Sequence, residues 1–165
     1  TFSLKERFVL IPLEICMLWK QLLVAFVLFF ILSGVSPDFF SLAAALDRGS
    51  ILMLATLVAI TSGAIISPLL LPWIPFRQFW LKGAVIGGLA ALALLFPGEP
   101  SVNRLEKLAL FLWIIGCSSF LAMNFTGSTP FTSLSGVEKE MRRGLPLQIG
   151  ATMLALIFWV IAPFS

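Results

Sequence analysis

The chain has 165 residues, of which 59% are hydrophobic and 12% charged, and its mean hydropathy is +1.05. Soluble domains carry roughly a quarter charged residues, so this composition excludes an ordinary soluble domain and indicates an integral membrane protein. The net charge of +3 comes mainly from residues that flank apolar segments, which argues against a nucleic-acid partner.

The expected fold is all-α, an integral membrane bundle of about five transmembrane helices, because a helix needs roughly 20 apolar residues to cross a bilayer. The expected spans cover about residues 13–35, 51–74, 80–96, 105–125 and 145–162, within a transmembrane domain at 21–163. The chain begins with Thr1 and lacks a basic, apolar leader, so we expect it to be the membrane part of a longer protein.

The first apolar segment is preceded by charged residues on both sides of Pro12, so residues 1–20 are expected to enter along the membrane interface. Proline is tolerated in the first turn of a helix, and the first helix is therefore expected to begin at Pro12. After this span, Ser36-Pro37-Asp38 is a helix-start signal. The segment that follows, up to Gly49, predicts a short interfacial helix on the membrane surface.

The second and third spans carry small residues at helical spacing. Ala59 and Gly63 lie four residues apart in the second span, as do Gly83 and Gly87 in the third. Small residues at this spacing let two helices approach closely, so these four residues are expected to form a packing seam between the two spans. Pro68 should kink or end the second span.

Ionisable and catalytic chemistry is sparse along the chain. There is no histidine, which removes the commonest general base and the commonest transition-metal ligand. Cys16 and Cys117 lie far apart in apolar surroundings, where cysteine usually behaves as a small buried hydrophobe. No charge falls in the middle of spans two to five, which disfavours a pump or an ion-coupled transporter. We predict no catalytic, cofactor-binding or metal-binding residue in this chain.

The basic residues divide unevenly between the two sides of the expected bundle. With the N-terminus in the cytoplasm, eight of them fall on the cytoplasmic side and three on the other. Cytoplasmic loops carry an excess of Lys and Arg. We therefore expect a multi-pass protein of the cytoplasmic (inner) membrane, with the N-terminus and the loop 126–143 in the cytoplasm and the C-terminus outside.

A polar stretch at 124–143 separates the last two spans and is the best candidate for a specific site. It is longer than the usual connection between helices, and long loops tend to be functional. Hydroxyl groups and backbone amides in such a stretch can bind an anion or clamp another domain, but the Gly-Lys-Ser/Thr ending of a P-loop is absent. The alternative is a solvated connector. The candidate docking residues are Asn124, Thr126, Gly127, Ser128, Thr132, Ser133, Ser135, Glu138, Lys139, Arg142 and Arg143.

Two segments of the chain resemble the C-terminal membrane domain of the HgcA-type corrinoid protein of microbial mercury methylation. They are NFTGSTPFTSLSGVEKEMRRGLPLQ at 124–148 and FVLIPLE at 8–14. The resemblance implies that a cytoplasmic corrinoid (cobalamin) domain precedes this membrane domain. It implies an anaerobic methyltransferase that passes a methyl group from a cobalt corrinoid to mercury(II), with a ferredoxin-like iron–sulfur partner that returns electrons to the cobalt. The family's cobalt-facing cysteine belongs to a motif of the soluble domain that is absent here, so neither cysteine of this chain takes that role.

Two functions of different classes follow. In the first, the chain is the membrane anchor of such a methyltransferase, without catalytic residues of its own, and its cytoplasmic loop docks the corrinoid domain or the iron–sulfur partner. In the second, it is a small permease or channel subunit for a neutral or thiol-bound solute. The lack of charge within the spans favours the anchor.

Overall fold

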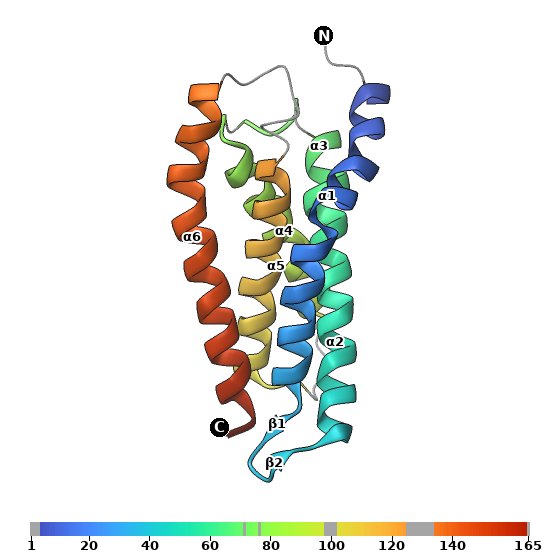
Figure 1. Cartoon of the computed structure of the whole chain (residues 1–165), viewed down its shortest axis with the longest axis vertical. Helices are drawn as coiled ribbons and strands as arrows, with labels where there is room; N and C mark the ends of the chain where they lie inside the picture. Colours follow the sequence, from blue (N-terminus) through green and yellow to red (C-terminus); the bar gives the residue numbers. More distant parts are fainter. Residues whose placement is uncertain (1–3, 71, 76, 98–101, 125–133, 165) are drawn as a thin grey trace.

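A computed structural model of the chain describes residues 4–70, 72–75, 77–97, 102–124 and 134–164. The described part is mostly helical and forms an elongated bundle (Figure 1), so the prediction of an all-α fold is confirmed at this level. In chain order the elements are α1 (Leu4–Ser33), β1 (Val35–Ser36), β2 (Phe39–Phe40), α2 (Leu42–Ile60), the π-helix η1 (Thr61–Ile66), α3 (Ser67–Leu69), α4 (Phe79–Leu95), α5 (Arg104–Asn124), α6 (Leu134–Ile161) and the 3-10 helix η3 (Ala162–Phe164).

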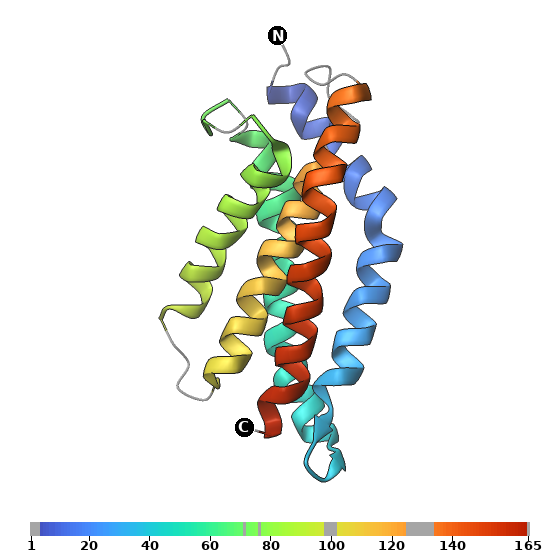
Figure 2. The same ribbon diagram turned by 90° about the vertical axis from the view of Figure 1, so that its left-hand side faces the viewer.

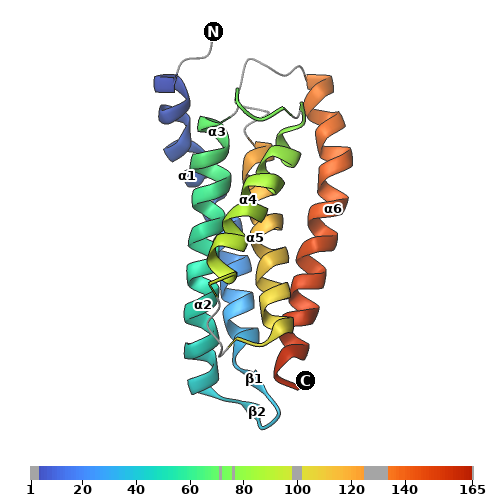
Figure 3. The ribbon, with the colours of Figure 1, turned by 180° about the vertical axis from the view of Figure 1, so that it is seen from behind.

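Helix α5 lies at the centre of the bundle (Figures 1 and 3). It packs most extensively against α4 and α6 and also against α2, whereas α1 packs mainly against α2. The starts of α1, α4 and α6 lie at one end of the bundle, which we call the N-terminal end. The β1–β2 hairpin and the end of α6 lie at the other, which we call the hairpin end.

Helix α1 begins at Leu4, so the expected start at Pro12 is wrong. Leu, Lys, Glu and Arg, which fill its first turn, are favourable helix formers, and the helix continues through Pro12. A proline inside a helix removes one backbone hydrogen bond and kinks the axis. Figure 2 shows the N-terminal turns of α1 inclined to the rest of the helix.

The expected interfacial helix up to Gly49 is also wrong, because α2 runs without interruption from Leu42 to Ile60. Ser36-Pro37-Asp38 lies in a hairpin, in which Ser36 pairs with Phe39, and the helix is capped by Ser41, whose hydroxyl accepts from the Ala44 N–H. Gly49 does not end the helix. A Cβ at Gly49 would lie 2.4 Å from Cε2 of Phe30, so glycine is present there to admit the ring of α1.

A π-helix precedes Pro68 and lets the second span continue up to this proline. A proline has no N–H, and its ring clashes with the carbonyl group four residues earlier in a regular α-helix. In η1 the Ser67 N–H instead reaches back five residues to the Ser62 carbonyl group, which also accepts from the Ser67 hydroxyl at 2.8 Å. The regular helix ends soon afterwards at Leu69, as expected for Pro68.

The glycines of the expected seam pack against α5 rather than directly against one another. A Cβ at Gly63 would lie 2.7 Å from the Ser118 carbonyl oxygen, and one at Gly83 would lie 2.6 Å from the same atom. A Cβ at Gly87 would lie 2.6 Å from Ser118 Cβ. Ala59 is fully buried. The small residues therefore let α4 and η1 approach the same short stretch of α5 from two sides.

Within the described residues, three helical segments are long and apolar enough to cross a membrane: Leu42–Leu69, Arg104–Met123 and Met141–Phe164. The apolar segments Trp19–Ser33 and Phe79–Leu95 are shorter. Large apolar side chains such as Val24, Leu57, Leu89 and Met153 are exposed around the bundle. An apolar outer surface over an interior that holds hydrogen-bonded polar side chains is compatible with a membrane protein.

Candidate functional site

The candidate docking residues divide between described and undescribed parts of the chain. Thr126, Gly127, Ser128, Thr132 and Ser133 lie outside the described residues. Asn124 is the last residue of α5, and Ser135 lies in the first turn of α6. Within the loop predicted at 126–143, the charged residues 137–143 are expected to form a helical turn, because Glu138 and Arg142 form an i,i+4 pair. Residues 134–143 are helical, but they are continuous with the rest of α6, so the expected boundary between this loop and the last span is wrong.

The first turns of α6 carry exposed charges at the N-terminal end of the bundle. Arg142 Nη2 lies 2.9 Å from Glu138 Oε1, an i,i+4 pair whose side chains are 80% and 66% exposed. Lys139 and Arg143 are exposed as well. Close packing begins at Gly144, where a Cβ would lie 3.0 Å from Cγ of Trp80. The charged turns are thus presented outward on a helix that is anchored one turn later.

Other basic residues near this end are also exposed, namely Lys5 and Lys20 on α1 and Arg77 before α4. Lys82 differs, since it is buried and its Nζ lies 5.5 Å from the centre of the Phe79 ring. The described part of the N-terminal end is therefore rich in accessible positive charge. Such a surface can attract the anionic headgroups of a bilayer or an acidic protein surface.

A chain of hydrogen bonds crosses the bundle at Ser118 and Ser119 of α5. Ser62 Oγ donates to Ser118 Oγ at 3.1 Å, and Ser118 Oγ donates to the Gly83 carbonyl group at 2.8 Å. Ser119 Oγ donates to the Trp80 carbonyl group and accepts from Gln148 Nε2, both at 2.8 Å. These bonds tie η1, α4 and α6 to the central helix at the place where the glycines allow close approach.

A second polar cluster, centred on Arg48, lies at the hairpin end, and the sequence interpretation missed it. Arg48 Nε lies 2.7 Å from Glu106 Oε1, and these side chains are only 11% and 14% exposed. Arg48 also donates to the carbonyl groups of Ser33 and Trp159 and stacks 4.3 Å from the Trp159 ring centre. Arg48 and Glu106 each lie within the first two turns of a long helix, but the sequence interpretation placed Arg48 in a separate surface helix.

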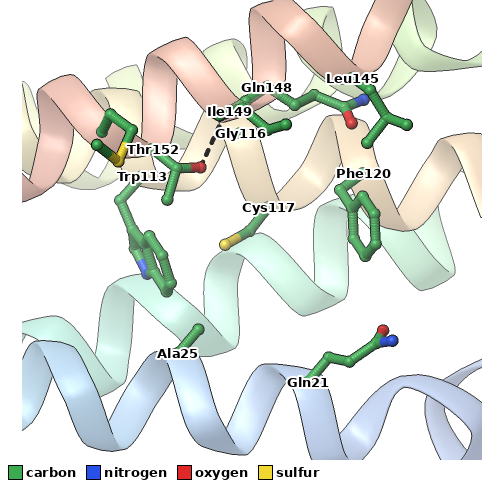
Figure 4. Close-up of a pocket in the computed structure, with 11 residues that line it drawn as sticks. Gln21, Ala25, Trp113, Gly116, Cys117, Phe120, Leu145, Gln148, Ile149 and Thr152 are labelled. Atoms are coloured by element: carbon green, nitrogen blue, oxygen red, sulfur yellow. Dashed lines mark hydrogen bonds between the residues drawn. The ribbon is translucent and has the colours of Figure 1, made fainter. Parts of the chain in front are cut away.

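A pocket of about 260 Å³ lies between α1, α5 and α6 (Figure 4). Its wall is almost entirely apolar and includes Trp113 and Phe120 of α5. Cys117 lies between them with its sulfur turned towards the space. Because α1 packs mainly against α2, a space is left where α1 faces α6. The described residues thus form a candidate ligand site between these three helices.

The two glutamine side chains of this pocket lie at one end. Gln21 of α1 and Gln148 of α6 lie towards the N-terminal end of the bundle, and Trp113 lies towards the hairpin end (Figure 4). Gln148 is 6% exposed, and its Oε1 has no hydrogen-bond partner. A glutamine inside an apolar span is a sequence signal for a site, but the pocket depends on the arrangement of three helices.

The described residues include no group of three or more Cys, Asp or Glu side chains placed to hold one metal ion. Cys16 is exposed and Cys117 is buried in the pocket wall, so the two described cysteines do not form a pair. Chemically, the described sites offer an exposed charged end, a buried ion pair and an apolar pocket with one free acceptor.

No known protein family, curated protein or solved structure matches this chain. The site geometry and the sequence resemblance of 124–148 are therefore what bear on its function.

Proposed function

We propose that this chain is the membrane-anchoring domain of an HgcA-type corrinoid methyltransferase. In this proposal, it holds a cytoplasmic corrinoid-binding domain and its ferredoxin-like iron–sulfur partner at the membrane, and five helical segments cross the cytoplasmic membrane. The observation that carries the proposal is that the start of α1 and the exposed charged turns of α6 share one end of a bundle with an apolar outer surface.

The place of these two elements fits a docking role. A soluble domain that precedes α1 would join the bundle at the same end as the first turns of α6 (Figure 1). Glu138, Lys139, Arg142 and Arg143 are exposed there and offer charge of both signs to a partner. Rim charges of this kind steer association and fix orientation more than they add affinity.

The sequence resemblance also supports a docking site at the N-terminal end of the bundle. It is clearest over 124–148, and residues 134–148 of that range form the first turns of α6. An anchor that needed only apolar helices would not require a specific amino-acid sequence at this position. Packing explains the glycine at position 144, since its close contact with Trp80 fixes α6 against α4. Among the described residues, these exposed charges contact no other part of the bundle, and the Glu138–Arg142 pair lies within the helix itself.

The chemistry of methyl transfer would belong to the soluble domain, where a corrinoid supplies the cobalt-bound methyl group. The contribution of this chain would be positional. Tethering two soluble components to one membrane surface raises their effective concentration for each other. The positive N-terminal end would face the cytoplasm, where basic residues near a bilayer gain about 1 kcal/mol each from anionic lipids.

The docking role is tested by replacing Arg142 and Arg143 together with glutamate in the complete protein, expressed with its iron–sulfur partner. Both side chains are exposed, so we expect insertion and protein level to be unchanged. We expect mercury methylation to fall, because the reversed charge weakens docking. The measurement is methylmercury formed per unit of membrane-inserted protein.

Arg104→Glu is the matched control, because Arg104 is exposed and begins α5 at the opposite, hairpin end. This variant should methylate like the parent. If the double variant methylates mercury like the parent, the docking role is wrong and the 124–143 segment is a simple connector. A corrinoid-binding domain encoded directly upstream of Thr1 would independently support the anchor.

The pocket favours the second candidate, a small permease for a neutral or thiol-bound solute, because it holds Cys117 within the bundle. A permease must carry solute from one side to the other, whereas an anchor need not. Proteoliposomes that contain this chain alone separate the two, since uptake of a neutral thiol complex above that of empty liposomes would support transport and oppose a purely anchoring role.

A further inference from the structure

We infer that the pocket between α1, α5 and α6 is a binding site for a neutral, lipid-soluble aromatic compound that carries a hydroxyl group. The inference does not depend on the anchoring role proposed above. It follows from one buried acceptor that lacks a donor, from the aromatic wall beside that acceptor, and from the position of the opening.

The acceptor is Oε1 of Gln148, and its orientation is fixed by the hydrogen bonds around it. The Ser119 hydroxyl has one proton, which it donates to the Trp80 carbonyl group. Towards Gln148, Ser119 can therefore only accept, so the amide must turn its nitrogen to Ser119 and its oxygen away. Figure 4 shows that oxygen on the side that faces Phe120, at the end of the pocket.

An unpartnered acceptor at this depth is a cost to the folded protein. Gln148 is 6% exposed and its Oε1 has no partner. Nearly all buried polar atoms in folded proteins have a hydrogen-bond partner, and an exception calls for an explanation. The neighbouring Met123 sulfur cannot supply a proton, and the Thr152 hydroxyl donates to the Gln148 backbone carbonyl group instead. None of the described residues around Gln148 donates to this oxygen, so a ligand that enters the pocket can supply the donor.

The other lining residues indicate which chemical class of ligand fits the pocket. Trp113 and Phe120 line the pocket and make part of its wall aromatic, and the Trp113 ring also packs against Phe29, with ring centres 4.3 Å apart. No charged side chain is found among the described lining residues, so an ionic ligand would lose its hydration without compensation. An engineered apolar cavity of about 150 Å³ holds a benzene molecule, so about 260 Å³ leaves room for a larger ring system.

The position of the opening suggests entry from the bilayer. Gln21 is exposed and adjoins Lys20, which we expect at the headgroup level, while the exposed Ile149 and Met153 face the apolar surroundings. A ligand could therefore place its hydroxyl group near the interface and its ring deeper. An acyl chain lacks a donor and a quinone has only acceptors, so neither satisfies Gln148, whereas a phenol, a naphthol or the reduced, quinol form does.

The test compares 1-naphthol with 1-methoxynaphthalene, which has a similar ring but no donor, by titration calorimetry of the chain in nanodiscs. Titration into empty nanodiscs corrects for partition into lipid. We expect 1-naphthol to bind roughly ten times more tightly, because it alone satisfies the buried oxygen. Gln148→Leu should remove this preference while leaving the pocket apolar. Equal affinity of the parent for both compounds would overturn the inference, because the free oxygen would then be satisfied by water.

Two further variants test the location of the site without touching its hydrogen bonds. Ala25→Phe fills the pocket from α1 and should abolish the saturable part of binding. Val24→Phe adds the same bulk one residue earlier, where the side chain is 70% exposed and does not line the pocket, and should bind like the parent. Saturable binding that survives Ala25→Phe in folded protein, checked by thermal unfolding, would show that the ligand sits elsewhere.

Discussion

Arg48 joins four helices at the hairpin end of the bundle. It belongs to α2 and contacts Ser33 of α1, Glu106 of α5 and Trp159 of α6. The planar guanidinium group suits this position, because it can donate in several directions and stack on an aromatic ring at the same time. Removing it leaves the Glu106 carboxylate nearly buried without its counter-charge, and such a change costs more than the pair itself contributes.

We predict that Arg48→Leu lowers the free energy of unfolding in detergent by about 3 kcal/mol, the cost of breaking a buried ion pair. Arg142→Leu breaks the exposed pair with Glu138 and should cost less than about 1 kcal/mol. Thermal unfolding of both variants measures the difference. A similar loss in both would show that the Arg48 cluster is as solvated as the surface pair.

Trp159 turns inward although the sequence places it near the end of a span, where tryptophans usually form an exposed belt. Its side chain is 1% exposed, and its Nε1 donates to Ser33 Oγ at 2.9 Å. We predict that Trp159→Phe keeps most of the packing but loses this bond, at a cost of about 1 kcal/mol. Trp73→Phe, at a position that is 83% exposed, is the control and should leave the unfolding temperature unchanged.

At the scale of the elements, the contact of α4 with α5 depends on glycine. A Cβ at Gly83 would lie 2.5 Å from Ala122 Cβ and 2.6 Å from the Ser118 carbonyl oxygen, so the two helices would have to move apart. This movement would stretch the hydrogen bond from Ser118 to the Gly83 carbonyl group. Close packing and hydrogen bonding therefore support each other at one point of the interface.

We predict that Gly83→Ala destabilises the protein by roughly 1 to 3 kcal/mol through overpacking. Gly88→Ala, in the same helix, is the matched control, since its Cβ would meet only Ile115 at 3.7 Å. The control should be neutral or gain up to about 1 kcal/mol, because alanine is the better helix former. Unfolding in detergent compares the two, and equal stability of both variants would mean that α4 and α5 are not in close contact at Gly83.

The second helical segment shows where local signals compete with packing. Ser36-Pro37-Asp38 is a typical start signal for a short helix and Gly49 a typical end signal, and both led to a wrong helix boundary. The glycine accommodates the Phe30 ring, and the proline lies in the hairpin between α1 and α2. Local signals could not show that a side chain from another helix fills the space at Gly49.

For the whole molecule, the proposed orientation has the N-terminal end in the cytoplasm. In a background with Cys16 and Cys117 replaced, we predict that Asp47→Cys reacts with an impermeant thiol reagent added outside intact cells. Lys139→Cys should react only after the membrane is opened. Both native side chains are exposed, at opposite ends of the bundle, so access is decided by the membrane alone. Labelling of Lys139→Cys from outside would invert the orientation.

The sequence by itself determined the fold class and the approximate position of the apolar helices. Burying backbone polar groups in an apolar medium requires helices, and the length of each apolar run limits where a helix can lie. It also singled out the charged turn of Glu138 and Arg142, because i,i+4 pairs are local. It identified the glycines as sites of close approach, and their nearest neighbours in the structure lie on α5.

Only the tertiary structure decided which helix those glycines approach, that Arg48 meets Glu106, and that Gln148 lies beside an apolar pocket. Each of these features joins residues far apart in the chain, and apolar segments of similar composition do not specify their neighbours. In an apolar medium, the choice of neighbour depends on shape and on a few hydrogen bonds. The central position of α5 is the result, because Ser118 and Ser119 can bond to η1, α4 and α6 only from there.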